Sequence, residues 1–345
     1  MKRPFLSYLL LITVLASLFA PPTGMVEAAV SLPISAPSAL LLDDTAHHFT
    51  YIKTPHLRRP PASTTKLLTA IVALESLGLN AVITIPAYIE RTEPSKINLR
   101  RGERYRVREL IQATLINSAN DAAEALAFAA GRGSRAKFAA MMNAKAKRLG
   151  CKNSHFVNPS GLPAAGQYSS AYDMALIMRE LQRYPFLFQT LKTRTLLIKS
   201  AGGRRVYLRN HNKWLWRDRR EVVGKTGWTR LARHCFVGRM SVNGRKVFVA
   251  MLGSHRLWQD LKALVDYQFG AAYIRALKNQ KIWGTDETKR IQSALKRAGF
   301  NPGKADGRFG PATIKAVQGF QRSRGLKPDG VVGPQTFSSL KRYYK

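Results

Sequence analysis

The sequence predicts a mixed α/β (α+β) protein with an antiparallel sheet flanked by helices, a helical subdomain and a smaller helical domain at the C-terminus. Apolar residues recur with helical spacing over 66–77 and within 107–130. Two strand-like runs, 235–238 and 247–252, flank Asn243-Gly244, a dipeptide typical of tight hairpins. The final 60 residues combine helical patterns with an internal repeat.

The helix expected at 66–77 begins next to a serine and a lysine that lie one turn apart. Pro61 precedes it and Gly78 follows it, as helix start and stop signals do. Ser63 is therefore expected at the helix N-terminus, with Lys66 on the same face. Ser63 could equally be a plain helix cap, and Ser-x-x-Lys occurs again at three other serines: Ser134, Ser293 and Ser338.

A serine and a lysine at this spacing can form a nucleophile and its base. A serine hydroxyl attacks well only when a neighbouring base takes its proton. Lys66 can do so only when neutral, whereas a free lysine titrates near about 10.4. Burial, the positive end of a helix and a second cation all lower a lysine pKa. Lys225 is the candidate for that second cation.

The next two elements carry short polar motifs in fixed order. Ser118-Ala119-Asn120 interrupts the apolar pattern of 107–130, either as an ordinary helix–helix loop or as a polar relay. Lys225-Thr226-Gly227 precedes the two strand-like runs, where a cation and a hydroxyl could face a carboxylate. Gly227 would let a peptide lie against the strand edge.

Taken together, the motifs resemble those of serine-type D-alanyl-D-alanine carboxypeptidases, the low-molecular-mass penicillin-binding proteins. The resemblance covers residues 31–272 and implies a β-lactamase/transpeptidase-like fold. It extends to the residues around each motif and to one further stretch: Pro61–Leu67, Ser118–Ala123, Phe156–Leu162 and Lys225–Thr229.

The resemblance also implies a role for each motif residue. Ser63 would be the acylated nucleophile, Lys66 its base, and Ser118 a proton relay to the leaving amine. The substrate would be held by Asn120, Lys225, Thr226, Gly227, Trp228 and Arg256, with the oxyanion bound by the backbone amides of Ser63 and Trp228. The implied reaction removes the terminal D-alanine from peptidoglycan stem pentapeptides and is inhibited by penicillin, with no cofactor.

Three alternatives remain open. A DD-endopeptidase acting on cross-links would use the same residues. A class A β-lactamase needs a deacylating glutamate in a Glu-x-x-Leu-Asn context, which Glu124, Glu180 and Glu221 all lack. A non-catalytic wall-binding protein on this fold is disfavoured by the complete motif set.

The C-terminal segment 286–345 carries an imperfect repeat with a spacing of 23 residues. Residues 306–313 and 329–336 both read Asp-Gly-x-x-Gly-Pro-x-Thr, a loop leading into a helix start. The segment resembles the three-helix peptidoglycan-binding module of wall hydrolases, with a helical dimerisation domain as the alternative. Residues 273–285 are expected to form the linker.

The N-terminus predicts export. Lys2-Arg3 precedes an apolar run and a small-residue site near Ala28, which together indicate a signal peptide over 1–28. An uncleaved anchor is the alternative. The mature protein would act in the periplasm or cell wall, on peptidoglycan stem peptides and glycan.

The chain is strongly basic, with 56 Lys+Arg against 20 Asp+Glu and a net charge of +36. In an exported protein without a nucleic-acid motif, this charge favours anionic envelope polymers or a negatively charged membrane surface over nucleic acid as partners. A merely solvated basic surface is the alternative.

The cysteines and histidines give no metal-site pattern. The seven histidines lack zinc-binding spacing, and His155 and His234 are expected to have local structural roles. Cys151 and Cys235 could form a disulfide in an oxidising compartment. A buried free thiol is the more common state for a cysteine in a strand-like run such as that of Cys235.

Overall fold

The computed structural model describes residues 32–44, 48–217, 221–242 and 245–344. The predicted leader, 1–28, and the predicted turn at Asn243-Gly244 lie outside these residues. Within the described ranges, no helix has both the length and the apolar character needed to cross a bilayer.

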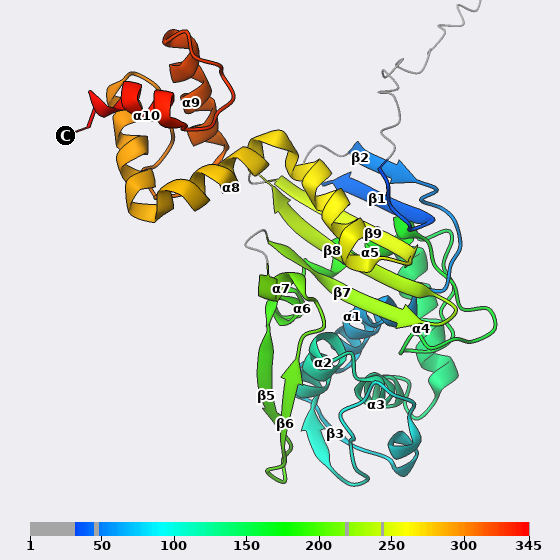
Figure 1. The fold of residues 1–345 in the computed structure, drawn as a ribbon. Helices are drawn as coiled ribbons and strands as arrows, with labels where there is room; N and C mark the ends of the chain where they lie inside the picture. The colour runs from blue at the N-terminus through cyan, green and yellow to red at the C-terminus, as the bar shows by residue number, and fades with distance from the viewer. Residues whose placement is uncertain (1–31, 45–47, 218–220, 243–244, 345) are drawn as a thin grey trace, which may run out of the picture. The chain divides into compact units, whose positions relative to one another are not determined.

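A five-stranded antiparallel sheet forms the centre of the first part of the chain, in the order β2-β1-β9-β8-β7 (Figure 1). The two strand-like runs of the sequence lie in β8 and β9, which pair antiparallel as predicted. β7 is an edge strand and carries the Lys-Thr-Gly motif. The strands are β1 (Ser38–Asp43), β2 (His48–Lys53), β7 (Val222–Thr229), β8 (Arg233–Val242) and β9 (Arg245–Ser254).

Both faces of this sheet are covered, because successive side chains of a strand point to opposite sides. On one face, Leu41 and Phe236 pack with Leu261 and other residues at the start of α8 (Leu257–Arg297). On the other face, Leu40 and Phe248 pack with the helices of the helical part. Figure 1 shows α8 and α5 on opposite sides of the sheet.

The helical part contains the predicted first helix, α1 (Lys66–Leu77), which directly follows a short 3₁₀ turn, Ala62–Thr65. The apolar stretch 107–130 divides into two helices at the Ser118–Asn120 motif, as its polar residues indicate. The remaining elements are β3 (Val82–Thr84), η2 (Ala87–Arg91), β4 (Arg104–Arg106), α2 (Val107–Ile116), α3 (Asn120–Ala130), α4 (Arg135–Arg148), α5 (Ala171–Leu181), α6 (Pro185–Lys192), β5 (Thr195–Lys199), β6 (Arg205–Arg209) and α7 (Trp214–Arg217).

The residues expected to form the linker, 273–285, lie within helix α8. Gly284 has a positive φ of 64° inside this helix, a conformation that glycine adopts without the steric penalty of a side chain. The regular α-helical backbone is therefore interrupted at Gly284.

The C-terminal module consists of the last part of α8 together with α9 (Pro311–Ser323) and α10 (Pro334–Lys341). These three helices enclose a separate apolar core that includes Ile291, Val317 and Phe320. The two repeated loops each lead into a helix with proline in its first turn, as the sequence predicts.

One glutamine fixes each repeated loop in the same way. Gln292 Nε2 donates to Asp306 Oδ1, the Arg308 carbonyl and Thr313 Oγ1, and its Oε1 accepts from the Gly307 N–H. The second loop repeats this pattern around Gln321, with Asp329, the Val331 carbonyl, Thr336 and Gly330 as the partners. The repeated Asp, Gly and Thr are therefore structural residues.

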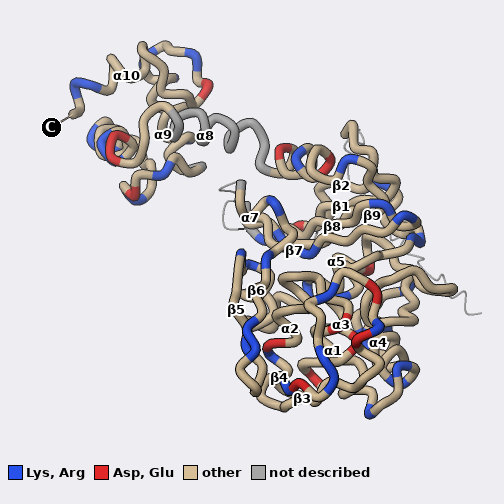
Figure 2. Tube along the Cα trace, turned by 60° about the horizontal axis from the view of Figure 1, so that its bottom comes forward, with Lys and Arg blue, Asp and Glu red and all other residues tan. Residues whose placement is uncertain are grey.

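Lys and Arg occur throughout both parts of the chain, and Asp and Glu are fewer (Figure 2). Both cysteines are free thiols. Cys235 is fully buried, with its Sγ 3.8 Å from the Pro60 carbonyl oxygen, and Cys151 contacts the Asp173 carbonyl. The disulfide that the sequence left open is therefore not formed in this structure.

Candidate active site

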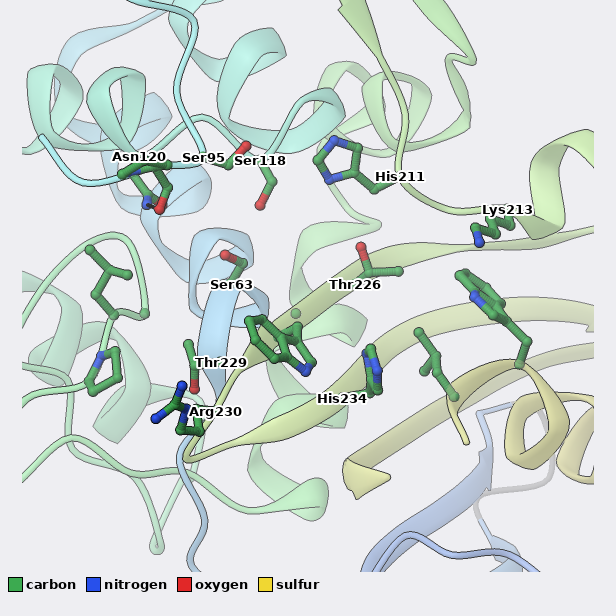
Figure 3. Close-up of a pocket in the computed structure, with 18 residues that line it drawn as sticks. Ser63, Ser95, Ser118, Asn120, His211, Lys213, Thr226, Thr229, Arg230 and His234 are labelled. Carbon is green, nitrogen blue, oxygen red and sulfur yellow. Dashed lines mark hydrogen bonds between the residues drawn. The ribbon is translucent and has the colours of Figure 1, made fainter. Parts of the chain in front are cut away.

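A cleft of about 910 Å³ opens beside β7 and contains the first residue of each of the first two motifs. Its walls come from the turn before α1, the loop between η2 and β4, the loop between α2 and α3, the loop at 161–163, the loop after β6, β7 with the turn after it, β8, and the start of α8. Figure 3 shows Ser63, Ser118 and Thr226 around the same open space. The fold thus brings three separate sequence motifs to one site.

Ser63 lies in the 3₁₀ turn that leads into α1, and the edge strand β7 passes very close to it. A Cβ atom on Gly227 would lie 2.9 Å from the Ser63 amide nitrogen and 3.1 Å from that of Thr64. Any side chain at position 227 would therefore collide with the backbone beside Ser63. The sequence predicts that Gly227 lets a substrate peptide lie against the strand edge. The structure adds a second reason for glycine here, because β7 passes close to the turn that carries Ser63.

Lys66 is fully buried, and its Nζ touches three oxygen atoms. Ser63 Oγ lies at 2.9 Å, Asn120 Oδ1 at 2.6 Å and the Ser160 carbonyl oxygen at 2.7 Å. The last two oxygens can only accept hydrogen bonds. A neutral Lys66 would thus donate its two protons to them and turn its lone pair toward the Ser63 hydroxyl.

The surroundings of Lys66 favour that neutral form. Burial lowers the pKa of the ammonium well below its ordinary value, and the charge of Lys225 lowers it further, whereas Glu124 and Asp121 oppose the shift. These surroundings are those that a lysine needs if it is to accept a proton.

Asn120 is occupied by contacts within the protein. Its Nδ2 donates to the carbonyl oxygens of Glu93 and Pro94, both at 2.9 Å, while Oδ1 accepts from Lys66. The resemblance implied that Asn120 holds the substrate's amide. In this structure it positions Lys66 and the loop at 93–94, so a substrate contact through Nδ2 would require one of these bonds to break.

Ser118 and Lys225 form the second polar pair. Ser118 links α2 to α3 with a positive φ of 59°, which is unusual for a serine and places strain in the loop. Lys225 Nζ lies 2.9 Å from Ser118 Oγ and donates to the Thr226 carbonyl oxygen, also at 2.9 Å. Lys225 is only 2% exposed, and burial lowers its pKa to about 7.

The loop 158–162 fixes the carbonyl group that holds Lys66. Asn158 Oδ1 accepts from the Ser160 hydroxyl and the Gly161 N–H, and Gln167 bonds to the backbone of residues 157, 158 and 162. Gly161 has φ +83°, and a Cβ there would lie 1.8 Å from the Ala62 carbonyl oxygen. The stretch Phe156–Leu162 supported the resemblance without an assigned role. In the structure it positions the Ser160 carbonyl against Lys66 and packs against the turn that carries Ser63.

Arg256 does not lie at the cleft. It precedes α8, and its guanidinium group reaches toward the Pro33 carbonyl oxygen at 3.5 Å. The lysine and arginine that line the cleft are instead Lys213 and Arg230, which belong to none of the three motifs and were not predicted. Lys213 follows a polar run after β6, and only the folding of that loop against β7 brings it to the cleft.

Two histidines also line the cleft. Desolvation and the charges of Lys225 and Lys66 lower the pKa of His211 to about 4. His234 packs beside the exposed ring of Trp228, with the ring centroids 6.3 Å apart. His155, by contrast, bonds to the Gly166 carbonyl oxygen and has the local role expected for it.

The other Ser-x-x-Lys motifs have ordinary positions. Ser134 is the N-cap of α4 and accepts from the Lys137 N–H, while Ser293 and Ser338 lie within α8 and α10. The three glutamates considered for deacylation form ion pairs: Glu124 with Arg135, Glu180 with Lys145, and Glu221 with Lys192 and Arg239. None of these three lines the cleft.

The arrangement suits acyl transfer, because one hydroxyl group lies beside a buried amine of lowered pKa and a second hydroxyl group contacts a second buried amine. Within the described residues, no group of three or more His, Cys, Asp or Glu side chains is placed to hold a metal ion.

Comparison with known proteins gives two family matches. Residues 25–256 match the family described as D-alanyl-D-alanine carboxypeptidase, and residues 284–340 match a peptidoglycan-binding domain family. The chain is 33% identical to the D-alanyl-D-alanine carboxypeptidase DacB2 of Mycobacterium tuberculosis over 62% of this chain and 75% of that protein. It is 32% identical to a D-alanyl-D-alanine endopeptidase of Escherichia coli over 69% of this chain and 79% of that protein.

Solved structures give the same result. A D-alanyl-D-alanine carboxypeptidase structure from Mycobacterium tuberculosis has a TM-score of 0.66 and 30% identity, covering 70% of this chain and 94% of that one.

Proposed function

Because the chain belongs to the D-alanyl-D-alanine carboxypeptidase family, we propose that Ser63 is the nucleophile with which this serine-type enzyme releases the terminal D-alanine of peptidoglycan stem pentapeptides. The observation that carries this assignment is the contact of Ser63 Oγ with Lys66 Nζ at 2.9 Å, while the other partners of Lys66 can only accept. That contact supplies the base that a serine nucleophile requires.

In the proposed acylation step, Ser63 Oγ attacks the carbonyl carbon of the penultimate D-alanine and its proton passes to Lys66 Nζ. The resulting oxyanion accepts hydrogen bonds from the backbone amides of Ser63 and Trp228. The closeness of Gly227 to the Ser63 amide supports this placement, because it brings the strand next to that turn.

The leaving D-alanine needs a proton on its amine when the C–N bond breaks. Ser118 is proposed to deliver it, since its Oγ is in contact with Lys225 Nζ. Water then hydrolyses the ester on Ser63, which releases the shortened peptide and restores the hydroxyl group. Thr226, which lines the cleft, and Lys225 directly behind it are proposed to bind the terminal carboxylate.

A β-lactam would acylate Ser63 by the same route. The three glutamates that were candidates for the deacylating base of a β-lactamase form ion pairs outside the cleft. We therefore expect the penicilloyl ester to be long-lived.

The Ser63 assignment is tested by labelling with fluorescent penicillin and by D-alanine release from a soluble pentapeptide. Ser63→Ala should abolish both while leaving the thermal unfolding unchanged. Ser134→Ala is the matched control, because that serine belongs to the same motif but caps α4; it should label normally and lose about 1 kcal/mol of stability. Labelling of the Ser63→Ala variant would refute the assignment.

Cleavage of cross-links is the second candidate activity, and it is favoured by the endopeptidase among the similar proteins. The same acylation step would then release a peptide rather than free D-alanine. Digestion of a purified pentapeptide and a cross-linked muropeptide dimer in parallel separates the two activities.

The C-terminal module is proposed to hold the enzyme on peptidoglycan. Its match to a peptidoglycan-binding family supports this role, and residues 286–345 add 13 basic and four acidic residues, a net charge of +9. Tethering a weak binder raises the local enzyme concentration at the polymer. Such substrates lie outside the cytoplasm, which agrees with the leader predicted at 1–28; anionic envelope polymers are proposed as additional partners of the basic surface.

Removal of residues 286–345 tests the targeting role. The truncated enzyme should turn over a soluble pentapeptide normally but be retained poorly on insoluble sacculi. Retention of the full chain should weaken as salt rises, because ionic contacts are screened. Equal sedimentation of the truncated and full chains with sacculi would refute it.

A further inference from the structure

The two halves of the C-terminal module share their hydrogen-bonding residues but differ beside the second loop. Both loops are held by a buried glutamine, Gln292 or Gln321, through matching contacts. The residues that the repeat has in common are thus used for structure. Residues that differ between the two halves of the module are therefore the better candidates for binding a ligand.

The second half has two adjoining hollows, of about 390 and 400 Å³, that both reach Gly333 and Pro334. The larger is lined by Trp283 and Phe337, with Lys341 at its edge. In the first half the position equivalent to Phe337 is Ile314, which is buried in the module core. Phe337 also packs against this core, but it is only partly buried and lines the hollow as well.

The aromatic rings of this hollow form a fixed platform. Trp283 and Phe337 stack with centroids 4.3 Å apart and planes inclined by 18°. The Trp283 indole N–H donates to the Val332 carbonyl oxygen at 3.0 Å, which fixes the ring. Ile282, also at the hollow, is 60% exposed. A preorganised apolar surface binds with little loss of side-chain freedom.

This surface matches the chemistry of an amino-sugar polymer. A pyranose ring presents a face of C–H groups, which are attracted to the negative face of an aromatic ring. The acetyl methyl group of an N-acetylated sugar fits an apolar hollow. Lys341, whose Nζ lies 6.0 Å from the Phe337 ring centroid, supplies a cation for the carboxylate of a lactyl ether on a neighbouring sugar.

We propose that the hollow formed by Trp283, Phe337 and Lys341 binds the glycan strand of peptidoglycan, with an N-acetylated sugar against the aromatic rings. The volume of each hollow lies within the about 300–1,000 Å³ of ordinary ligand sites. The proposal rests on the targeting role of the module and adds to it a ligand class and a place on the module.

The experiment uses the full chain and peptide-free glycan strands, prepared by amidase digestion of sacculi. Phe337→Leu keeps an apolar side chain but removes the ring, and Lys341→Glu reverses the charge at the edge. Each should weaken glycan binding by about tenfold, the size expected for a central contact of a binding site. Lys315→Glu, an equal charge change at an exposed position on α9, should change binding less than about twofold.

Thermal unfolding and pentapeptide turnover of each variant show that the fold and the active site are intact. Glycan binding by Phe337→Leu and Lys341→Glu at the level of the unaltered chain would overturn the proposal, and so would binding of free stem peptides without binding of peptide-free glycan. In both cases the truncated chain still shows separately whether the module targets the enzyme, because its loss of sacculus binding does not depend on where the ligand sits.

Discussion

The catalytic cleft and the C-terminal module both contain buried polar side chains with several partners, but the two regions use them in opposite ways. Lys66 contacts three oxygen atoms, one of which is Ser63 Oγ, and burial together with a neighbouring cation lowers its pKa. Gln321 in α9 also has several partners, yet it is neutral, and its partners lie in the loop at 329–331 and at the start of α10.

This comparison separates reactivity from stability. Burial makes the charged form of a lysine costly, so the buried lysine of the cleft favours its neutral form, which can accept a proton. A buried glutamine is neutral, and when all its donors and acceptors have partners its burial has no such cost. Its hydrogen bonds then hold the loop in one conformation. Substitutions in the cleft should therefore affect catalysis first, and substitutions in the module stability first.

The largest effect is expected for Lys66→Met. Loss of the base should lower the rate of acylation by about 10²–10⁴-fold, the usual range for general-base catalysis. Thermal stability should not fall, since methionine fills a similar volume without a buried amine. The rate constant for acylation by penicillin measures the effect, and a decrease of less than about tenfold would remove Lys66 from the base role.

Lys225→Ala should act on substrate selection as well as on rate. Loss of a charge-assisted contact is worth about 1.5–3 kcal/mol, so the preference for a free terminal carboxylate over its amide should fall by about tenfold or more. Lys213→Ala, at the cleft but outside the motif, is the matched comparison. An unchanged preference in Lys225→Ala together with a lost preference in Lys213→Ala would move the carboxylate contact to Lys213.

Gln321→Leu should destabilise the module and leave catalysis intact. The Gly330 N–H and the Val331 carbonyl lose a buried partner, which costs about 1–3 kcal/mol. Gln292→Leu in the other half should have a similar effect because its contacts match. Thermal unfolding and pentapeptide turnover are measured on both variants; a loss of turnover in either would show that the two regions are not independent in this way.

The pH dependence of stability should be the most modest effect. The pKa of Lys225 is about 7 in the folded protein against 10.5 in its ordinary state. Between these values the unfolded lysine holds a proton that the folded one has lost, so the free energy of unfolding rises with pH there. Lys225→Met should reduce that rise by about 1.4 kcal/mol per pH unit between pH 7 and 9.

Denaturant unfolding at pH 7, 8 and 9 measures this slope. Lys213→Met is the control, because it makes the same substitution at an exposed position of the cleft. Identical slopes for the unaltered chain and Lys225→Met would mean that Lys225 is charged in the folded protein at these pH values.

Most of the fold was predictable because its signals are local. The bounds of α1, the division of 107–130 at Ser118–Asn120 and the pairing of β8 with β9 follow from periodicity and from residues that start or stop helices. The helical form of residues 273–285 was not predicted, since that stretch has no repeat or motif to mark it.

The residues of the candidate site that belong to a motif could be predicted from the sequence. The cleft residues that come from loops outside the motifs were not predicted. Lys213 and Arg230 reach the cleft only because the loop after β6 and the end of β7 fold beside it. Arg256 was assigned to the site through the resemblance, without a motif of its own, and its side chain at the start of α8 reaches toward Pro33 instead. Sequence spacing gives no side-chain direction across a loop.

The sequence by itself determined the mixed α/β class, the order of the three motifs, the repeat of the module and the excess of positive charge. Only the tertiary structure decided that Lys66 faces Ser63, that Asn120 is held by the loop at 93–94, and that Lys225 stands behind Ser118. The physical reason is that helix and turn signals act between near neighbours. A lowered lysine pKa, by contrast, depends on burial and on charges brought together from distant parts of the chain.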